Sequence, residues 1–301
     1  QQIEFTTPKI ISPTFETLEA DSIEPTTAVC RGKVVNYGYP AARYGEFIYG
    51  LSPLLPCCDY DQKVVRLMPG SDFFSFRIIN LISNITYYFM ADYGQIVKLK
   101  TKAYYTEGGG ITDGSGKHYE TVKIKNQEWF AENLKTTKYA NGDPMVQWVD
   151  YGNQTSSTPN NTEPPIGMGY HYSYRATTDP RNVCPAGWHV ATRADWNTLL
   201  DNLGGEQGSS VKLRNKKPAW YPVDTLKKTN SSGLKLGPFG VASISSCCNW
   251  SNAQGSEGWW WLPEQANDST GKCFGVVWNS DNPTFGEKNK RLALSVRCVK
   301  D

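Results

Sequence analysis

Residues 184–196, Cys-Pro-Ala-Gly-Trp-His-Val-Ala-Thr-Arg-Ala-Asp-Trp, place a cysteine, a glycine turn and a tryptophan directly before a well-marked helix start. Thr192 can accept hydrogen bonds from the backbone of the first turn while Asp195 reaches back, which is a variant of the capping box. A glycine pair at 204–205 predicts the end of the helix. The apolar stripe between these signals is formed by Leu199, Leu200 and Leu203.

The chain ends, over residues 294–301, in Leu-Ser-Val-Arg-Cys-Val-Lys-Asp, whose alternation of apolar and polar residues predicts a strand. A covalent link from Cys184 to Cys298 would tie the helix start to this strand. Eight cysteines allow many pairings, however, and the residues alone do not select one. Cys30, for example, could form a disulfide with Cys57 or with Cys58. The remaining cysteines are Cys57, Cys58, Cys247, Cys248 and Cys273.

The cysteines also bear on the cellular compartment. They occur beside only three histidines and without a C-x-x-C pair, so disulfides are favoured over zinc. This pattern predicts an exported protein in an oxidising compartment. Buried thiols in a cytosolic protein are the alternative.

Charge and hydropathy exclude two classes of partner. The 301 residues carry 31 basic and 29 acidic side chains, so charge gives no case for nucleic acid or an anionic membrane surface. No run of 18 apolar residues is present, so we expect no transmembrane segment. The opening Gln-Gln-Ile-Glu-Phe lacks the basic and apolar regions of a signal peptide, which we expect to be absent or already removed.

A glycine-rich segment predicts a domain boundary. Five glycines within nine residues are typical of a flexible connector, so we expect one domain over 1–107, a linker over 108–117 and a second domain over 118–301. Within the first domain, period-two alternation predicts short strands. The segments concerned are 28–34, 74–78 and 96–100.

The segment 81–91, Leu-Ile-Ser-Asn-Ile-Thr-Tyr-Tyr-Phe-Met-Ala, resembles the E–F corner of fibronectin type III and related immunoglobulin-like sandwiches. The resemblance implies an all-β immunoglobulin-like sandwich in which the hydroxyl of Tyr87 bonds back to the chain. In such a strand Phe89 and Ala91 would face the core, whereas Met90 would point outward.

Four motifs follow one another through the second domain. They are V-K-I-x-N-Q-E-W-x-A-E-N-L-K-T-T-K-Y-x-N-G-D-P from residue 122, C-P-x-G-W-H-V-x-T-x-x-D-W from residue 184, G-x-W-W from residue 258, and the terminal S-V-R-C-V-K-D. Together they resemble the Fibrobacter succinogenes major paralogous domain over residues 117–301.

This resemblance implies a small α+β domain of C-type-lectin-like fold, with two short helices and an antiparallel sheet. It also implies a disulfide between Cys184 and Cys298, and a second from Cys273 to Cys247 or Cys248. Members of the family are exported or surface-anchored proteins of Bacteroidetes and Fibrobacteres, and are often lipoproteins. The resemblance thus implies a location at the outer membrane and cell surface or in the periplasm. A removed N-terminal lipid anchor would therefore be the one route of membrane association.

The run Trp259-Trp260-Trp261 is the main candidate for contact with a ligand. Successive side chains of a strand alternate between faces, so either Trp260 or its two neighbours should point away from the core. An exposed tryptophan suits stacking on a sugar ring, and the long loop over 150–180 could add to the surface. The alternative is that loops cover this second face. The other aromatic candidates are Tyr170, Tyr172, Tyr174 and Trp278.

Calcium is the one cofactor to consider, because C-type lectins hold sugars through it. Three fragments come near the motifs concerned, but none matches them: Glu163-Pro164-Pro165, Leu262-Pro263-Glu264 and Trp278-Asn279-Ser280-Asp281. Calcium takes six to eight oxygen ligands, and these fragments supply only a few. We therefore expect no cofactor and no metal.

His189 is the best catalytic candidate, yet a Cys–His pair with Cys184 would need a thiolate that the implied disulfide removes. Because no nucleophile-elbow, phosphate-loop or paired-carboxylate signature is present, we do not expect an enzyme. The leading hypothesis is adhesion, in which an exported surface protein binds glycans or host or partner proteins through its second domain. The alternative is a structural subunit of a surface assembly, and an enzyme ranks below both.

Overall fold

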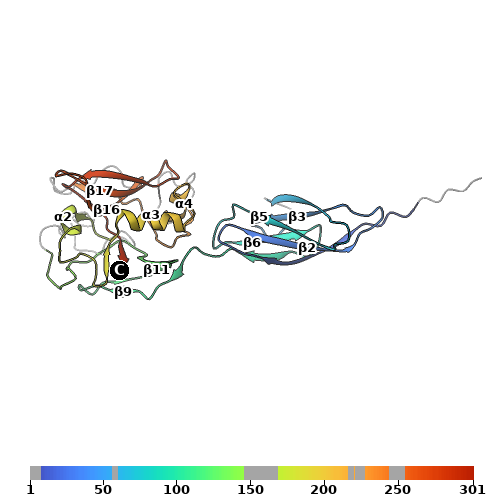
Figure 1. Ribbon diagram of the computed structural model, residues 1–301, viewed down its shortest axis with the longest axis horizontal. Helices are drawn as coiled ribbons and strands as arrows, with labels where there is room; N and C mark the ends of the chain where they lie inside the picture. Colours follow the sequence, from blue (N-terminus) through green and yellow to red (C-terminus); the bar gives the residue numbers. More distant parts are fainter. Residues whose placement is uncertain (1–7, 56–59, 146–168, 216–219, 221–227, 244–254) are drawn as a thin grey trace, which may run out of the picture. The chain divides into compact units, whose positions relative to one another are not determined.

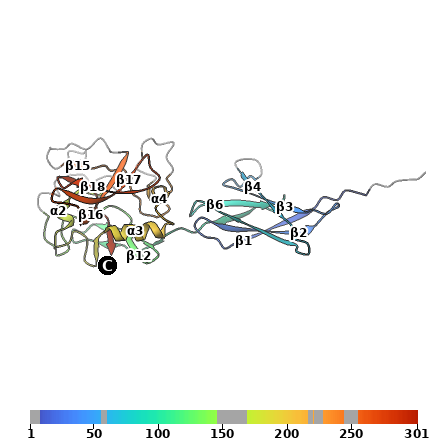
Figure 2. The same cartoon turned by 45° about the horizontal axis from the view of Figure 1, so that its top comes forward.

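The computed structural model of the protein describes residues 8–55, 60–145, 169–215, 220, 228–243 and 255–301. The chain divides into two compact units, Gln1–Ala103 and Tyr104–Asp301, both drawn in Figures 1 and 2. Among the helices described, none is long and apolar enough to cross a membrane.

The N-terminal unit is an all-β sandwich, as predicted. One antiparallel sheet has the strand order β1-β2-β5 and the other the order β4-β3-β6-β7, and the side chains of both meet in one core. Three of the strands cover the segments whose alternation predicted them. The bounds are β1 Thr14–Asp21, β2 Ala28–Asn36, β3 Tyr44–Gly50, β4 Tyr60–Arg66, β5 Phe73–Ile78, β6 Thr86–Ala91 and β7 Val97–Lys100.

The corner expected at Tyr87 is present. Its hydroxyl accepts a hydrogen bond from the backbone N–H of Ile82 at 2.9 Å, and Phe89 and Ala91 are fully buried. Met90 points away from this core, as predicted, although only 4% of it is exposed. Met90 does lie on the outer face of β6, but Leu55 from the segment after β3 packs over that face.

The C-terminal unit combines antiparallel sheets with short helices. Its largest sheet has the order β14-β20-β12-β11-β8, and the smaller ones are β16-β17-β18, β13-β19-β15 and β10-β9. Its relation to C-type lectins stays a prediction. The strands are β8 Thr106–Glu107, β9 Ile111–Thr112, β10 His118–Tyr119, β11 Thr121–Ile124, β12 Gln127–Phe130, β13 Tyr172–Ser173, β14 Trp188–Val190, β15 Ala242–Ser243, β16 Glu257–Gln265, β17 Thr270–Val277, β18 Thr284–Asn289, β19 Leu292–Leu294 and β20 Cys298–Lys300. The helices are α2 Tyr174–Thr177, α3 Arg193–Asn202 and α4 Ser209–Leu213.

Helix α3 forms where the sequence predicts it. Both halves of the capping box are made, with Asp195 N–H bonded to the Thr192 hydroxyl at 3.2 Å and Thr192 N–H bonded to the Asp195 carboxylate at 2.8 Å. The helix ends before two glycines with positive φ. Its apolar face packs in a core shared by β11, β12, β16 and β17, so α3 lies between two sheets (Figure 1).

The predicted closing strand over 294–301 is interrupted. It is divided into β19 and β20, and between them Ser295 forms a bridge with Trp260 of β16. The interruption also carries the side chain of Arg297 into the core, where it is fully buried. Alternation predicted the extended backbone, but it could not show that the two halves belong to different sheets.

The glycine-rich segment is part of the C-terminal unit and does not connect the units. The boundary lies between Ala103 and Tyr104, and strands β8 and β9 pair with β11 and β10. The glycines allow close packing here, since a Cβ at Gly108 would lie 2.0 Å from Oγ1 of Thr121 and Gly110 has φ +66°. We predicted a flexible linker because glycine has no side chain, but the same property lets the backbone pack closely against β11.

Candidate functional site

The aromatic run in β16 is not an exposed surface. Trp260 packs in the core that contains α3, while Trp259 and Trp261 pack in a second core on the other face of the strand. The side chains alternate as predicted, but both faces are covered. Trp259, the least buried of the three, is 9% exposed and lies under the ammonium group of Lys288, 4.0 Å from its ring centre.

The predicted tyrosine patch is buried as well. Tyr172 is fully buried and donates its hydroxyl to the carbonyl of Thr136 at 3.1 Å, and Tyr174 donates to the carbonyl of Pro263 at 2.9 Å. Tyr170 is 6% exposed. The loop over 150–180, which was expected to add to this surface, lies outside the described residues as far as 168. These tyrosines therefore support the fold and leave no face for a ligand.

Trp278 is the one predicted contact residue with an accessible side chain, 41% of it exposed. It follows β17 in a turn held by Arg214, whose guanidinium is fully buried and donates to the carbonyl of Val277 at 2.8 Å and to that of Ser280. These hydrogen bonds from the buried guanidinium hold the backbone of the turn in place. No described side chain forms a ring contact with this indole.

A cleft of about 320 Å³ lies beside the glycine-rich segment, in the C-terminal unit. Its volume is at the lower end of the range for small-molecule sites. This cleft was not predicted from the sequence. Its signal is the glycine run followed by a histidine and a glutamate, a segment that we interpreted as a linker. The lining residues are Tyr105, Glu107, Gly108, Gly109, Gly110, His118, Glu120, Thr121, Val122, Ala131, Gly233 and Lys235.

Glycines shape the walls of this cleft. Gly108 brings the backbone against β11, where its N–H donates to the carbonyl of Thr121 at 2.8 Å. Gly233 lies against the face of Tyr105, because a Cβ there would meet three atoms of the ring at 2.9 Å each. Gly109, in contrast, has no heavy atom within 4 Å of the position of a Cβ. The cleft therefore has an aromatic wall and a wall of exposed backbone.

Charged side chains form the rim of the cleft. The ammonium of Lys235 donates to the carboxylate of Glu120, and this hydrogen bond lowers the pKa of Glu120 below its usual value. Glu107 and His118 are exposed beside them. The rim thus combines two carboxylates, one ammonium and one imidazole. It offers donors and acceptors to a polar, uncharged ligand rather than a field for a strong ion.

The residues of the family-like motifs converge in a buried network away from the cleft. Oδ1 of Asn133 accepts from Nε1 of Trp260 and from Nε of Arg297, each at 2.8 Å, and Nδ2 of Asn133 donates to the hydroxyl of Ser295 at 3.1 Å. Arg297 also donates to the carbonyl of Phe130 at 2.7 Å. Three of the four motifs are thus joined by hydrogen bonds, and their role here is to hold the fold.

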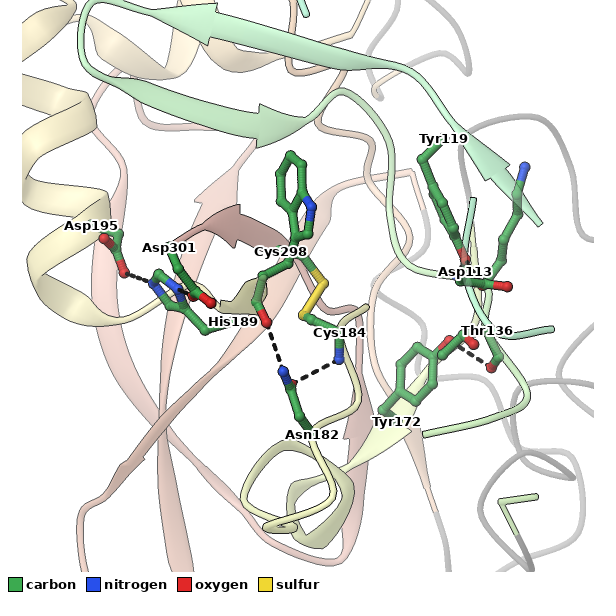
Figure 3. Close-up of a disulfide and its surroundings, with 12 residues drawn as sticks. Asp113, Tyr119, Thr136, Tyr172, Asn182, Cys184, His189, Asp195, Cys298 and Asp301 are labelled. Atoms are coloured by element: carbon green, nitrogen blue, oxygen red, sulfur yellow. Dashed lines mark hydrogen bonds and ion pairs between the residues drawn. A yellow bond between two sulfur atoms is a disulfide. The ribbon is translucent and has the colours of Figure 1, made fainter. Parts of the chain in front are cut away.

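The disulfide implied by the resemblance is present, between Cys184 and Cys298 with 5.9 Å between the Cα atoms. Figure 3 shows the side chain of Asn182 beside it, where it accepts from the N–H of Cys184 at 3.0 Å and donates to the carbonyl of Trp188. The disulfide removes the thiolate that a catalytic pair with His189 would need. Such a bond indicates an exported protein.

Two further cysteines, Cys30 and Cys273, are buried thiols, and burial raises the pKa of each to about 12. They are therefore unreactive at neutral pH. The partners that sequence analysis offered for them are Cys57, Cys58, Cys247 and Cys248, which lie outside the described residues. Among the described residues, no group of three or more His, Cys, Asp or Glu side chains could hold a metal.

His189 lies between two carboxylates, as Figure 3 shows. Its Nδ1 is 2.7 Å from Oδ1 of Asp301 and its Nε2 is 3.1 Å from Oδ2 of Asp195, the helix-capping residue. Burial lowers the pKa of His189, but the hydrogen bonds to Asp301 and Asp195 outweigh this effect and raise it above the ordinary value. The imidazole thus joins the end of the chain to the start of α3.

We expect this histidine to make stability depend on pH. Because its pKa is raised by folding, its contribution is fully present below the unfolded value of about 6.5 and is lost as pH rises through the folded value. The variant His189→Gln should therefore be less stable than the wild type at pH 5 and differ less from it at pH 8. Urea unfolding at both pH values, monitored by tryptophan fluorescence, measures this. An equal difference at both pH values would contradict the prediction.

Comparison with known proteins assigns the family. Among solved structures, the sensor domain of the anti-sigma factor RsgI4 of Pseudobacteroides cellulosolvens is similar at 15% identity and TM-score 0.25 in a shorter form, which covers 30% of this chain and 94% of that one. A longer form of the same domain has 15% identity and a TM-score of 0.25, and the match covers 34% of this chain and 100% of that one. Its solution structure has 17% identity and a TM-score of 0.24, and the match covers 30% of this chain and 76% of that one. TM-scores this low do not establish a shared fold. None of the curated proteins matches the chain. The model of the Fibrobacter succinogenes major domain matches residues 122–300, which is more than half of the chain, and the protein therefore belongs to the Fibrobacter succinogenes major domain family.

Proposed function

We propose that this protein is an exported, non-catalytic surface protein that binds an uncharged glycan in the glycine-lined cleft of its C-terminal unit. The cleft itself carries the proposal. Tyr105 offers an aromatic wall for the apolar face of a sugar ring, and the rim offers side chains that accept from and donate to hydroxyl groups. In this proposal the protein is displayed at the outer membrane, with adhesion to glycans as its role.

The charge of the rim favours a glycan over an ionic ligand. Lys235 and Glu120 neutralise each other through their hydrogen bond, so neither presents an unpaired charge to the ligand. A glycan hydroxyl can both donate to a carboxylate and accept from an ammonium, which suits a rim of mixed sign. A stable interface with a protein partner buries a broad surface, whereas this cleft, with a volume of about 320 Å³, has the size of a small ligand.

The same rim argues against hydrolysis of the bound glycan. Glycosidases with two carboxylates need one of them protonated, with a raised pKa. Here Lys235 lowers the pKa of Glu120, which keeps that carboxylate ionised at neutral pH. Binding without turnover is therefore the activity that we propose.

The test is to fill the cleft without disturbing its walls. Gly109→Trp places a large side chain where a Cβ meets nothing within 4 Å, and Gly114→Trp is the matched control outside the cleft, where the nearest atom to a Cβ is 3.6 Å away. On an array of neutral oligosaccharides, we expect the wild type and Gly114→Trp to bind and Gly109→Trp to lose at least about tenfold in affinity, or 1.4 kcal/mol.

The circular dichroism spectrum and the thermal midpoint of Gly109→Trp should match those of Gly114→Trp. This control shows that a loss of binding does not result from unfolding. If the wild type binds no neutral glycan, the proposed function is wrong. If Gly109→Trp binds as well as the wild type, the ligand lies elsewhere, and the exposed Trp278 becomes the position to vary next.

A structural subunit of a surface assembly is the second candidate, and the N-terminal unit favours it. Of the 16 large apolar side chains that are exposed among the described residues, 15 lie in that unit. Where such side chains adjoin one another, they provide a surface for contact with other proteins. Sedimentation of the full chain over a range of concentrations would detect such assembly.

A further inference from the structure

Strand β4, Tyr60–Arg66, forms an open edge of the N-terminal sandwich. It is the first strand in the order β4-β3-β6-β7 and pairs with β3 on one side only, as far as the described residues show. Figure 2 shows it at the margin of the unit. An edge strand of this kind presents unpaired N–H and C=O groups on which another strand can form.

The register shows which backbone groups of β4 face outward. Tyr44 pairs with Arg66, and the N–H of Leu67 donates to the carbonyl of Arg43 at 2.9 Å in the same register. In an antiparallel ladder, residues alternate between groups that point to the partner strand and groups that point away. The odd-numbered residues of β4 therefore bond to β3, and the even-numbered residues, among them Val64, point their N–H and C=O groups away from the sheet.

Apolar side chains alternate with the polar Gln62 and Arg66 at these even positions. Val64 is 58% exposed and Tyr60 is 45% exposed, and Met68, the next position of the same parity beyond the strand, is 65% exposed. Part of the charge that usually protects an edge is paired here, since Lys63 forms an ion pair with Asp61 at 3.5 Å, whereas Arg66 is exposed. The edge thus joins accessible hydrogen-bonding groups with an apolar surface.

We propose that β4 pairs with β4 of a second copy of the chain, antiparallel, about a two-fold axis that passes through Val64. This register preserves the faces of the sheet and opposes Val64 to itself, Tyr60 to Met68 and Gln62 to Arg66. It therefore buries apolar groups against one another and opposes no like charges. The proposal develops the second candidate function and does not depend on the cleft.

Charge permits this partner and favours this register. Residues 1–103 contain 10 basic and 10 acidic side chains, so two copies of the unit do not repel each other through net charge. A two-fold axis moved by one residue to Lys63 would oppose that lysine to itself, which is unfavourable. The axis at Val64 opposes the residues from Tyr60 to Met68, two positions beyond the end of β4.

Charged substitutions at the axis provide the test. We expect the full-length wild type to sediment as a dimer, and Val64→Lys and Val64→Glu each to be monomeric, because two like charges then face each other. An equimolar mixture of the two variants should form dimers again, because position 64 of one copy meets position 64 of the other. Ser75→Lys, at an exposed position of β5 in the other sheet, should leave the wild-type dimer intact.

A cross-link checks the register. In a hydrogen-bonded antiparallel pair the Cα atoms are about 5.5 Å apart, which lies within the range for a disulfide. Val64→Cys should therefore form a disulfide-linked dimer on oxidation, whereas Gln62→Cys, which faces Arg66 of the other copy, should not. Equal cross-linking of both variants would overturn the register.

A wild type that is monomeric at every soluble concentration overturns the proposal, and so does a Val64→Lys variant that dimerises like the wild type. If the wild type is monomeric, the remaining partner for this edge is a strand of a different protein. Glycan binding should be unchanged in Val64→Lys, and dimers should persist in Gly109→Trp. The two proposals can therefore fail separately.

Discussion

Replacing both Cys184 and Cys298 by alanine is expected to lower the free energy of unfolding of the C-terminal unit by about 5 kcal/mol. The disulfide spans 114 residues of sequence, and a loop of that length loses much of its conformational freedom in the unfolded chain when it is closed. Both cysteines are fully buried, so alanine introduces no polar group into the core.

Tryptophan fluorescence measures this effect selectively, since all 10 tryptophans of the chain lie between Trp129 and Trp278, in the C-terminal unit. The midpoint of guanidinium unfolding should fall sharply in the double variant. The matched control is Cys30→Ala, which alters a buried cysteine of the N-terminal unit and should leave the fluorescence transition in place. A double variant with the wild-type midpoint would show that the link contributes little.

Asn133→Leu is expected to be nearly as damaging, with a loss of about 3 to 5 kcal/mol. The substitution leaves two buried donors, Nε1 of Trp260 and Nε of Arg297, without the oxygen that now accepts from both. The cost is high because Arg297 is fully buried, and burial already lowers its pKa to about 9. Urea unfolding followed by tryptophan fluorescence gives the loss directly.

A second substitution tests the reason for this loss. If the unsatisfied guanidinium causes most of it, then adding Arg297→Met to Asn133→Leu should recover stability, because an apolar side chain of similar length needs no hydrogen bond. Arg297→Met alone removes the guanidinium with its hydrogen bonds to Asn133 and to the carbonyl of Phe130, and it completes the double-mutant cycle. A double variant less stable than Asn133→Leu would mean that packing, not the unpaired charge, sets the cost.

Local signals in the sequence predicted local structure well. The capping box at Thr192, the glycines after α3 and the corner at Tyr87 were all predicted from residues a few positions apart, and the structure contains each of them. These features depend on hydrogen bonds within one or two turns of the chain, so neighbouring residues suffice to define them.

The candidate site was not predictable in the same way. The alternation of Trp259 to Trp261 was read correctly, but the sequence could not show that a second core lies on the other face of β16. The glycines at 108–110 have the composition of a linker, and only their pairing partner β11 makes them a wall of a cleft. Accessibility is decided by segments distant in sequence, which composition and periodicity do not report.

The sequence by itself determined the cap of α3, the alternation of the strands, the all-β N-terminal unit and, through the order of four motifs, the family. Tertiary structure alone decided that His189 lies between Asp195 and Asp301, that Asn133 holds Trp260 and Arg297, and that a cleft opens beside Gly109. The physical reason is range. Caps and strand alternation follow from backbone geometry over a few residues, whereas burial and the shape of a cleft are set by contacts between residues more than a hundred positions apart.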